Sequence, residues 1–389
     1  MRRQRKVTGA GFAQTLVLGG LMAPAATRRE QQHHAVQVGM PISTQGLEQR
    51  FTATAVTFMR QLLEEGLRQT IRSEQQGTVL PSFNGVYISD CSRVEWLATG
   101  VKLAVRWELQ RGQLEIQLRE LRENDQKSAV VDAALPEGAL HLNDLGFFKL
   151  TRFQRWNEQG VFWLTRFKVG TTVFTTEGEP LDLLQHLKQL PGPQCLPVQV
   201  GNQARLSAYL IAAPHPAPSA ANADGAAKRT STAGPTPDLP RQTAFARWTI
   251  YLTNIPDLTF DQAHTLARTR WQIELLFKLW KSHGQILRSR TADPCRQLCQ
   301  GYAKLLAVLV AHWMLLVAGW SLDNLGSLDA LRLVRTHTPL LMRAFTCPPL
   351  WRVLWLWLTA DLRLAARRSK RAKVPLAFQL WQVFDFSWS

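Results

Sequence analysis

The chain has 389 residues, of which 46% are hydrophobic, and this is enough to build two or three folded domains. Its net charge of +17 and pI near 10.3 favour a polyanionic partner, either nucleic acid or an anionic membrane surface. The five cysteines form no paired Cys-x-x-Cys and no Cys/His finger, which fits a reducing cytoplasm and gives no zinc-finger pattern.

Residues 1–76 are expected to be helical, with Gln and Arg on the polar face. Ser43 is a candidate helix cap ahead of apolar positions that include Leu47 and Met59. We interpret this region as a candidate DNA-binding module, although a basic face of this kind can also be simply solvated. Residues 1–26 also resemble an export signal, because a basic start is followed by an apolar stretch and small residues.

Residues 77–150 change to a strand pattern. A short apolar strand leads to Asp90, a hairpin and a short helix follow, and a second short strand leads to Asp144. The corresponding residues are 86–88 for the first strand, 102–109 and 114–118 for the hairpin, 126–134 for the helix and 140–142 for the second strand. This order of elements resembles the start of a ribonuclease-H-like fold.

Residues 151–250 are expected to be rich in strands. The candidates are 161–166, 171–175, 181–187, 199–200, 206–212 and 248–252, and residues 181–187 equally fit a short helix. Residues 213–242 are rich in Pro, Ala, Gly, Ser and Thr, which predicts a flexible loop. From Asp261 to about Leu364 the chain is expected to be helical. The apolar run 305–320 is shorter than the roughly 20 residues of a membrane span, which favours a buried helix.

The stretch Leu266–Leu287 carries the most specific pattern of the chain. In a continuous helix, Arg270, Glu274 and Lys281 share one narrow stripe, because steps of four and eleven residues turn only about 40° and 20° past whole turns. An acid flanked by two bases suits a metal-dependent site that cuts phosphate esters. The alternative is a solvated ion pair on a surface helix.

This stretch closely resembles the signature of a family of bacterial transposases, the insertion sequence 4 family. The signature reads Tyr, two residues, Arg, three residues, Glu, six residues, Lys, and Arg270, Glu274 and Lys281 match it. The Tyr position is Ala267, so the chain departs from the pattern there. Three further segments also resemble sequences of the family: Asp90-Cys91-Ser92, Asp144-Leu-Gly-Phe-Phe and residues 160–168.

The resemblance implies an α/β fold, with a ribonuclease-H-like core interrupted by a β-rich insertion and flanked by helical regions. The implied divisions are 1–76, the core in two parts at 77–150 and 251–320, the insertion at 151–250 and a helical region at 321–389. It implies a transposase in which Asp90, Asp144 and Glu274 are catalytic and bind Mg²⁺, for which Mn²⁺ can substitute.

The resemblance also implies DNA contacts. Arg270 and Lys281 are expected to contact phosphates. Arg268 is a candidate to compensate in part for the missing Tyr, although it lies at a different angle on the helix. Trp163 is a candidate for base stacking, with a structural tryptophan as the alternative. The implied partners are the terminal inverted repeats and target DNA, bound by a homodimer in the bacterial cytoplasm without a membrane. Two alternatives remain open: a DNA-binding remnant that no longer cuts, and an exported or membrane-associated basic protein.

Overall fold

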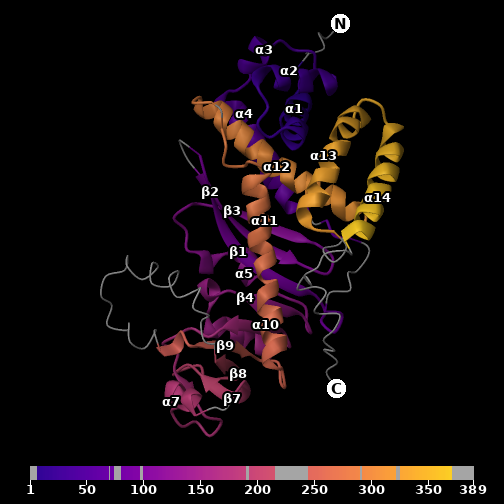
Figure 1. The fold of residues 1–389 in the computed structure, drawn as a ribbon. Helices are drawn as coiled ribbons and strands as arrows, with labels where there is room; N and C mark the ends of the chain where they lie inside the picture. The colour runs from indigo at the N-terminus through magenta and orange to yellow at the C-terminus, as the bar shows by residue number, and fades with distance from the viewer. Residues whose placement is uncertain are drawn as a thin grey trace, which may run out of the picture. The chain divides into compact units, whose positions relative to one another are not determined.

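A computed structural model describes residues 7–69, 71–73, 80–96, 100–189, 192–214, 244–289, 291–320 and 325–369. These residues form a mixed α/β fold in two compact units, whose elements are labelled in Figure 1. Unit 1 contains the described residues up to Pro81, together with Ile88–Ala133 and those from Trp271 onward; unit 2 contains Ser82–Tyr87 and those in Ala134–Arg270. Residues 215–242 of the expected flexible loop lie outside the described residues.

Unit 1 begins with four helices, as the N-terminal pattern predicted. They are α1 (Gly9–Met22), α2 (Arg28–Gln37), α3 (Thr44–Glu48) and α4 (Ala53–Arg68). Ser43 does cap a helix, since its hydroxyl accepts a hydrogen bond from the Gly46 amide. That helix ends at Glu48, however, and Thr52 caps the next one by accepting from Ala55 N. The cap at Thr52 therefore divides a stretch whose apolar spacing suggested one helix.

The strands of unit 1 confirm the predicted hairpin. Strands β2 (Gly100–Glu108) and β3 (Leu114–Arg119) pair antiparallel, in the register Lys102↔Arg119 to Trp107↔Leu114. Strand β1 (Val86–Glu95) is longer than the expected strand that ends at Asp90, so Asp90 lies in mid-strand. The 3-10 helix η1 (Asp125–Lys127) and the short helix α5 (Ala129–Asp132) follow, in the place of the predicted helix.

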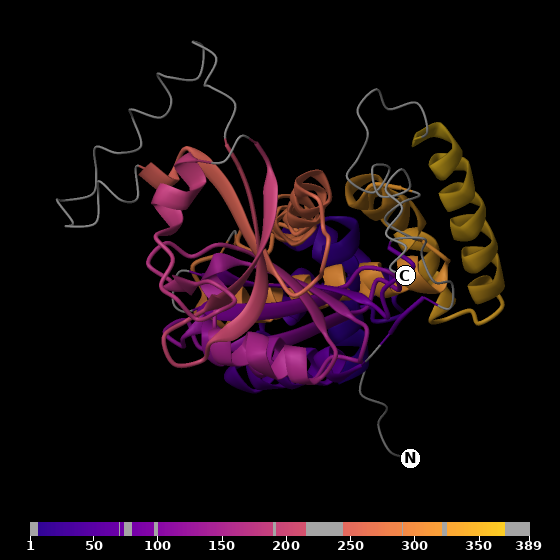
Figure 2. The ribbon, with the colours of Figure 1, turned by 90° about the horizontal axis from the view of Figure 1, so that it is seen from below.

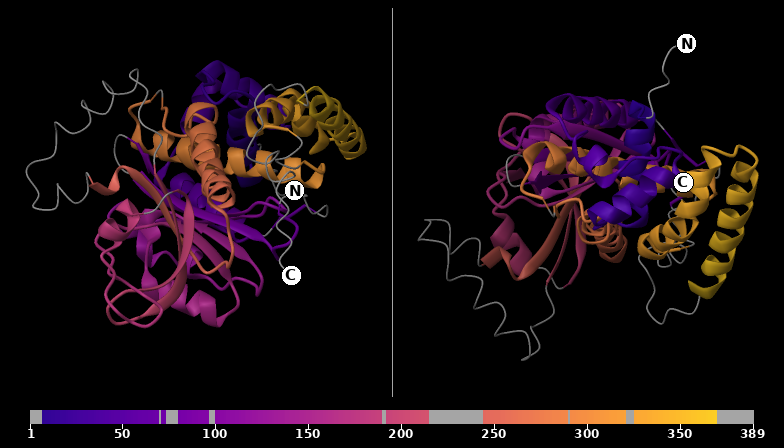
Figure 3. Two further views of the ribbon diagram at one scale, coloured as in Figure 1. Left: turned by 60° about the horizontal axis from the view of Figure 1, so that its bottom comes forward. Right: turned by 90° about the horizontal axis from the view of Figure 1, so that it is seen from above.

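The later part of unit 1 is helical, again as predicted. It contains α11 (Trp271–Ser282), α12 (Pro294–Val317), α13 (Ser327–Ala344) and α14 (Leu350–Ser369). Figure 2 shows α13 and α14 side by side, and Figure 3 shows the N-terminal helices beside α12. Helices α1 and α4 both pack on α12.

Helix α12 is the helix of unit 1 that most resembles a membrane span. Among the described residues it alone is long and apolar enough to cross a bilayer, yet 78% of its most apolar stretch is buried inside the chain. Its His312 is buried and bonds the Gly112 carbonyl through Nε2 at 2.7 Å. Packing on neighbouring helices accounts for its apolar surface, and this confirms the expected buried helix. Helix α1 is buried along most of its length in the same way.

Unit 2 is built around a mixed sheet. Strand β4 (Leu140–Asn143) pairs parallel with β5 (Phe162–Arg166), which pairs antiparallel with β9 (Trp248–Thr253). Strands β8 (Leu206–Pro214), β7 (Gln194–Val200) and β6 (Val173–Phe174) continue the sheet in antiparallel order. Strand β1 begins in unit 2 and continues in unit 1, and the hydrogen-bonded strand order is β3-β2-β1-β4-β5-β9-β8-β7-β6. The remaining elements of unit 2 are η2 (Leu145–Phe147), α6 (Leu150–Glu158), α7 (Leu183–Lys188) and α10 (Phe260–Thr269).

The structure differs from, or decides between, the expected elements at two places, residues 181–187 and residues 266–287. Residues 183–188 form the short helix α7 rather than a strand, because the Asp182 carboxylate accepts from Gln185 N and caps it. The stretch 266–287 is not one continuous helix, since α10 ends at Thr269 and α11 begins at Trp271. The Thr269 hydroxyl donates to the Thr265 carbonyl at 3.1 Å, and such back-bonding often bends a helix.

Candidate active site

Asp90 lies in the middle of β1, between buried Ser89 and half-buried Cys91. Its side chain is half-buried, and its Oδ1 accepts a hydrogen bond from the Cys91 amide at 2.7 Å. A carboxylate that is held locally and still reaches solvent can accept a further ligand. This position therefore agrees with the role expected from the sequence.

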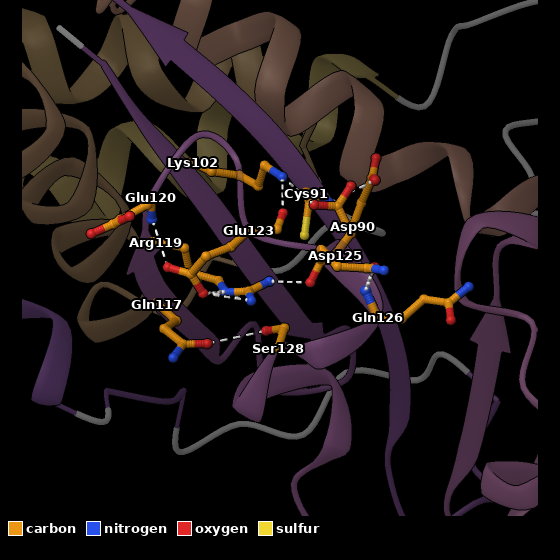
Figure 4. A network of polar contacts seen from close by, with 11 residues as sticks. Asp90, Cys91, Lys102, Gln117, Arg119, Glu120, Glu123, Asp125, Gln126 and Ser128 are labelled. Carbon is orange, nitrogen blue, oxygen red and sulfur yellow. Dashed lines mark hydrogen bonds and ion pairs between the residues drawn. The ribbon is translucent and has the colours of Figure 1, made fainter.

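Two buried cations paired with more exposed carboxylates lie beside Asp90 in unit 1 (Figure 4). Lys102 pairs with Asp125 at 2.7 Å, and Arg119 pairs with Glu123 at 2.7 Å. The two cationic side chains are only 6% and 3% exposed, so they depend on these carboxylates for compensation. The pairs join the β2–β3 hairpin to the segment that follows it, and they were not expected from the sequence. The sequence offers one signal for them. Lys102 and Arg119 are charged residues at paired positions of the hairpin, and both side chains are buried.

Cys91 is the one soft donor atom next to Asp90. Burial, together with the nearby carboxylates of Asp125 and Asp90, raises the pKa of this thiol to about 12. The free thiol is therefore protonated at neutral pH and is a weak nucleophile.

Glu274 lies in the first turn of α11, and Lys281 lies in the last turn. Ile273, Phe277 and Trp280 point into the core of unit 1, whereas Glu274 and Lys281 are half-buried at its margin. This placement is favourable for both charges, because the N-terminal end of a helix attracts an anion and the C-terminal end a cation. The seven-residue spacing also places the two side chains on the same side of α11.

Asp144 follows β4 directly, as the strand-to-turn pattern predicted. It caps η2, and its Oδ2 accepts from the Gly146 amide at 3.4 Å. Its Oδ1 is 3.5 Å from Nε of Arg270, which stands at the junction of α10 and α11. Unit 2 thus brings together one predicted carboxylate and one predicted phosphate-binding cation, although they are far apart in sequence.

Three further predicted positions lie in unit 2. Arg268 is exposed in the last turn of α10, and Ala267 beside it is half-buried. Trp163, in contrast, is fully buried, stacks on Phe153 at 4.4 Å and donates from Nε1 to Asn157 at 2.7 Å. The base-stacking interpretation of Trp163 is therefore wrong for this structure, because its ring has no exposed face. The structural alternative is the one observed.

The three carboxylates divide between the units, with Asp90 and Glu274 in unit 1 and Asp144 in unit 2. Over the part of the chain that the structure describes, no three or more His, Cys, Asp or Glu side chains form a group that could hold a metal ion. Their donor chemistry nevertheless fits a hard divalent ion, since all three are carboxylates with partly solvent-accessible side chains.

Asp90 thus lies on β1, Asp144 directly follows β4, and Glu274 lies on α11. Residues 99–310, more than half of the chain, match the family described as the transposase DDE domain. The chain therefore belongs to this family. The matched residues include Asp144, Arg270, Glu274 and Lys281 and begin after Asp90.

Several bacterial transposases are similar to the chain, and those of the IS231 elements are similar over most of its length. The transposase for insertion sequence element IS231F of Bacillus thuringiensis subsp. israelensis is 24% identical over 362 residues, which cover 80% of this chain and 74% of that protein. The IS231B transposase of B. thuringiensis subsp. berliner is 23% identical over 88% of this chain and 82% of its own length. The IS1151 transposase of Clostridium perfringens is 25% identical over 44% of this chain and 41% of its own length.

Proposed function

We propose that this chain moves an insertion sequence by cut-and-paste transposition, cleaving DNA at terminal inverted repeats and joining the ends to target DNA. The observation that carries the proposal is the transposase DDE domain match over residues 99–310, a range that includes Asp144 and Glu274. The IS231 relatives, which cover up to 88% of the chain, support the same activity.

The domain organisation belongs to this proposal. Strands β1–β5 have the order β3-β2-β1-β4-β5, in which a hairpin and two parallel strands follow the pattern of a ribonuclease-H-like core. Strands β6–β9 lie between β5 and α10, and we assign residues 151–250 as an insertion that extends this sheet. Residues 77–150 and 251–320 then form the two parts of the core, with 1–76 and 321–389 as flanking helical regions.

In this proposal Asp90, Asp144 and Glu274 are the catalytic residues and hold Mg²⁺ or Mn²⁺. Bound divalent ions would activate the attacking hydroxyl and stabilise the leaving oxygen of the phosphate ester. The chain itself contributes three carboxylates, from β1, the turn after β4 and α11. The local bonds of Asp90 and Asp144 to backbone amides hold those side chains before any ligand binds.

Arg270, Lys281 and Arg268 are the proposed DNA contacts of the signature region. Arg270 lies beside Asp144, so a phosphate that it binds is delivered next to a metal-binding carboxylate. Lys281 is half-buried at the end of α11, and Arg268 is exposed on α10. Such contacts act on phosphates whatever the sequence, and binding through them should weaken with salt.

The proposed substrate is double-stranded DNA, and pairing of two ends suggests a homodimer in the DNA complex. The proposed location is the bacterial cytoplasm, associated with the nucleoid. Hairpin formation at the cut ends is part of the resemblance to the insertion sequence 4 family.

One observation favours an alternative function, because Ala267 occupies the signature's Tyr position and lacks a hydroxyl for the terminal phosphate. The alternative is a transposase remnant that binds DNA ends without cutting them.

The decisive experiment is DNA cleavage on a plasmid that carries the gene with its native flanks. Wild type is compared with Asp90→Ala, Asp144→Asn and Glu274→Gln, each with Mg²⁺ and with a chelator. We expect metal-dependent breaks at both flanks that each substitution removes while end binding persists. Binding without breaks would identify the remnant, and breaks that survive all three substitutions would refute the assigned residues.

A further inference from the structure

Helix α11, which carries Glu274, ends in a short irregular segment, residues 283–288, here called the exit segment. The chain turns sharply there, since Gln285 has φ +50° and a Cβ on Gly284 would lie 2.5 Å from the Trp280 carbonyl oxygen. Amides of the exit segment bond the α11 carbonyls of Leu279 and Trp280, and the carbonyls of the exit segment itself take donors from other elements. The exit segment is therefore a place where other elements can hold α11.

Two cations from neighbouring helices of unit 1 supply such donors. Arg335 on α13 donates from Nη2 to the His283 carbonyl. Lys304 on α12 donates from Nζ to the Gln285 carbonyl at 3.2 Å and to the Arg288 carbonyl. Helices α12 and α13 thus both bind the backbone just beyond α11.

A third donor connects the exit segment to the strand of Asp90. The Trp96 indole, at the end of β1, donates from Nε1 to the Ile286 carbonyl at 2.9 Å. Trp96 is buried and packs edge-on against Tyr302 of α12 at 5.6 Å. Within unit 1, the strand of one proposed catalytic residue and the helix of another therefore meet at the exit segment.

Stability alone does not account for this use of buried cations. Lys304 is buried, and burial lowers the pKa of the half-buried Arg335, which records the cost of removing that charge from water. A buried charge carries a desolvation penalty that its partners only partly offset, so it is weak evidence for a gain in stability. The cations contribute directional hydrogen bonds, each of which holds one backbone carbonyl at a defined distance. Their positive charge is also favourable near the negative C-terminal end of α11.

We propose that Lys304 and Arg335 are positioning residues that hold α11 on β1 and thereby fix Glu274 relative to Asp90. This inference rests on the proposed function, because it requires the two carboxylates to act together. Glu274 lies nine residues before His283, about 14 Å along a rigid helix at 1.5 Å per residue. A tilt at the exit segment is therefore transmitted to the carboxylate, and a misplacement of about 1 Å can cost about 100-fold in rate.

The test compares Lys304→Met and Arg335→Met with the conservative Arg335→Lys in the full chain. The matched control is Arg332→Met, one turn earlier on α13, where the side chain is exposed and pairs with Asp329 at 2.9 Å. Hydrogen exchange of residues 279–288 is measured by mass spectrometry without metal. End-DNA affinity and the Mg²⁺ dependence of cleavage are then measured for the same proteins.

We expect both Met variants to exchange about 10-fold faster across the exit segment, because its carbonyls lose fixed donors. Cleavage should fall about 10- to 100-fold and need more Mg²⁺ for half-maximal rate, with end-DNA affinity unchanged. Arg335→Lys should be intermediate, and Arg332→Met should behave as wild type. If a Met variant fails to fold, Trp96→Phe serves instead, because it keeps a ring and removes only the donor to Ile286.

The outcomes separate the two proposals. Wild-type protein that binds ends without cutting them would overturn the proposed function, and the positioning role with it. If wild type cuts and Asp90→Ala does not, unchanged exchange in the Met variants would overturn only the positioning role. Faster exchange with unchanged rate and Mg²⁺ dependence would overturn it equally, because the bonds would then be structural.

Discussion

Trp163 allows a direct choice between a structural and a DNA-contacting tryptophan. Its side chain is fully buried in unit 2, stacked on Phe153 at an interplanar angle of 14°, and its N–H bonds Asn157. Substitution by alanine removes the stacked ring and leaves a cavity in the core. Substitution by phenylalanine keeps most of the stack and removes the N–H donor.

The expected losses of stability differ accordingly. Trp163→Ala should lower the free energy of unfolding by about 3–5 kcal/mol, the usual range for a large aromatic residue in a core. Trp163→Phe should cost about 1–2 kcal/mol, mainly through the lost hydrogen bond and the smaller ring. Asn157 Oδ1 keeps the Asn254 amide as a donor at 3.0 Å, so the phenylalanine variant leaves this acceptor satisfied.

The assay is urea unfolding, combined with end-DNA affinity at one salt concentration. Trp163→Phe should be less stable and bind DNA as wild type does. Trp271 on α11 provides the control, because it is 54% exposed and Trp271→Ala should change stability by less than about 0.5 kcal/mol. Wild-type stability in Trp163→Ala, together with weakened DNA binding in Trp163→Phe, would refute the reasoning.

Three further predictions concern the signature and the core. Ala267→Tyr should increase cleavage at the ends and Ala267→Phe should not, and equal rates in a plasmid cleavage assay would count against a role for the hydroxyl. Arg270→Ala should weaken end binding and reduce the slope of log affinity against log salt by about 1, as measured by a salt titration, because one phosphate contact is lost. Burial lowers the pKa of His312 to about 4, so the unfolded chain binds the proton first as pH falls. Up to about 3 kcal/mol of stability should therefore be lost between roughly pH 6.5 and 4, and His312→Gln should lack this slope in urea unfolding.

The sequence predicted those elements whose signals are local. The β2–β3 hairpin was recognisable because two alternating runs flank residues 110–113, and its antiparallel register follows that connection. The extent of β1 was less accessible, because polar residues follow Asp90 and look like the start of a turn. In the structure Ser92 and Val94 are buried and Arg93 is exposed, so the strand continues to Glu95. That continuation depends on neighbouring strands, which periodicity in one segment does not reveal.

The site residues show the same limit more sharply. The grouping of Arg270 with Glu274 on one stripe assumed a continuous helix, yet the hydrogen-bond ladder is interrupted between Thr269 and Trp271. Arg270 keeps helical dihedral angles, φ −51° and ψ −29°, so its spacing to Glu274 remains close to helical although the helix is divided.

The side chain of Arg270 nevertheless has a partner that no helical wheel contains, the carboxylate of Asp144 after β4. The single-helix stripe therefore did not predict the contact that Arg270 makes in the structure. A junction at Arg270 lets the cation serve the strand that carries Asp144 while α11 carries Glu274. A fixed spacing in the sequence can therefore reflect contacts with a different element of the fold. The geometry of a single helix does not account for the contact between Arg270 and Asp144.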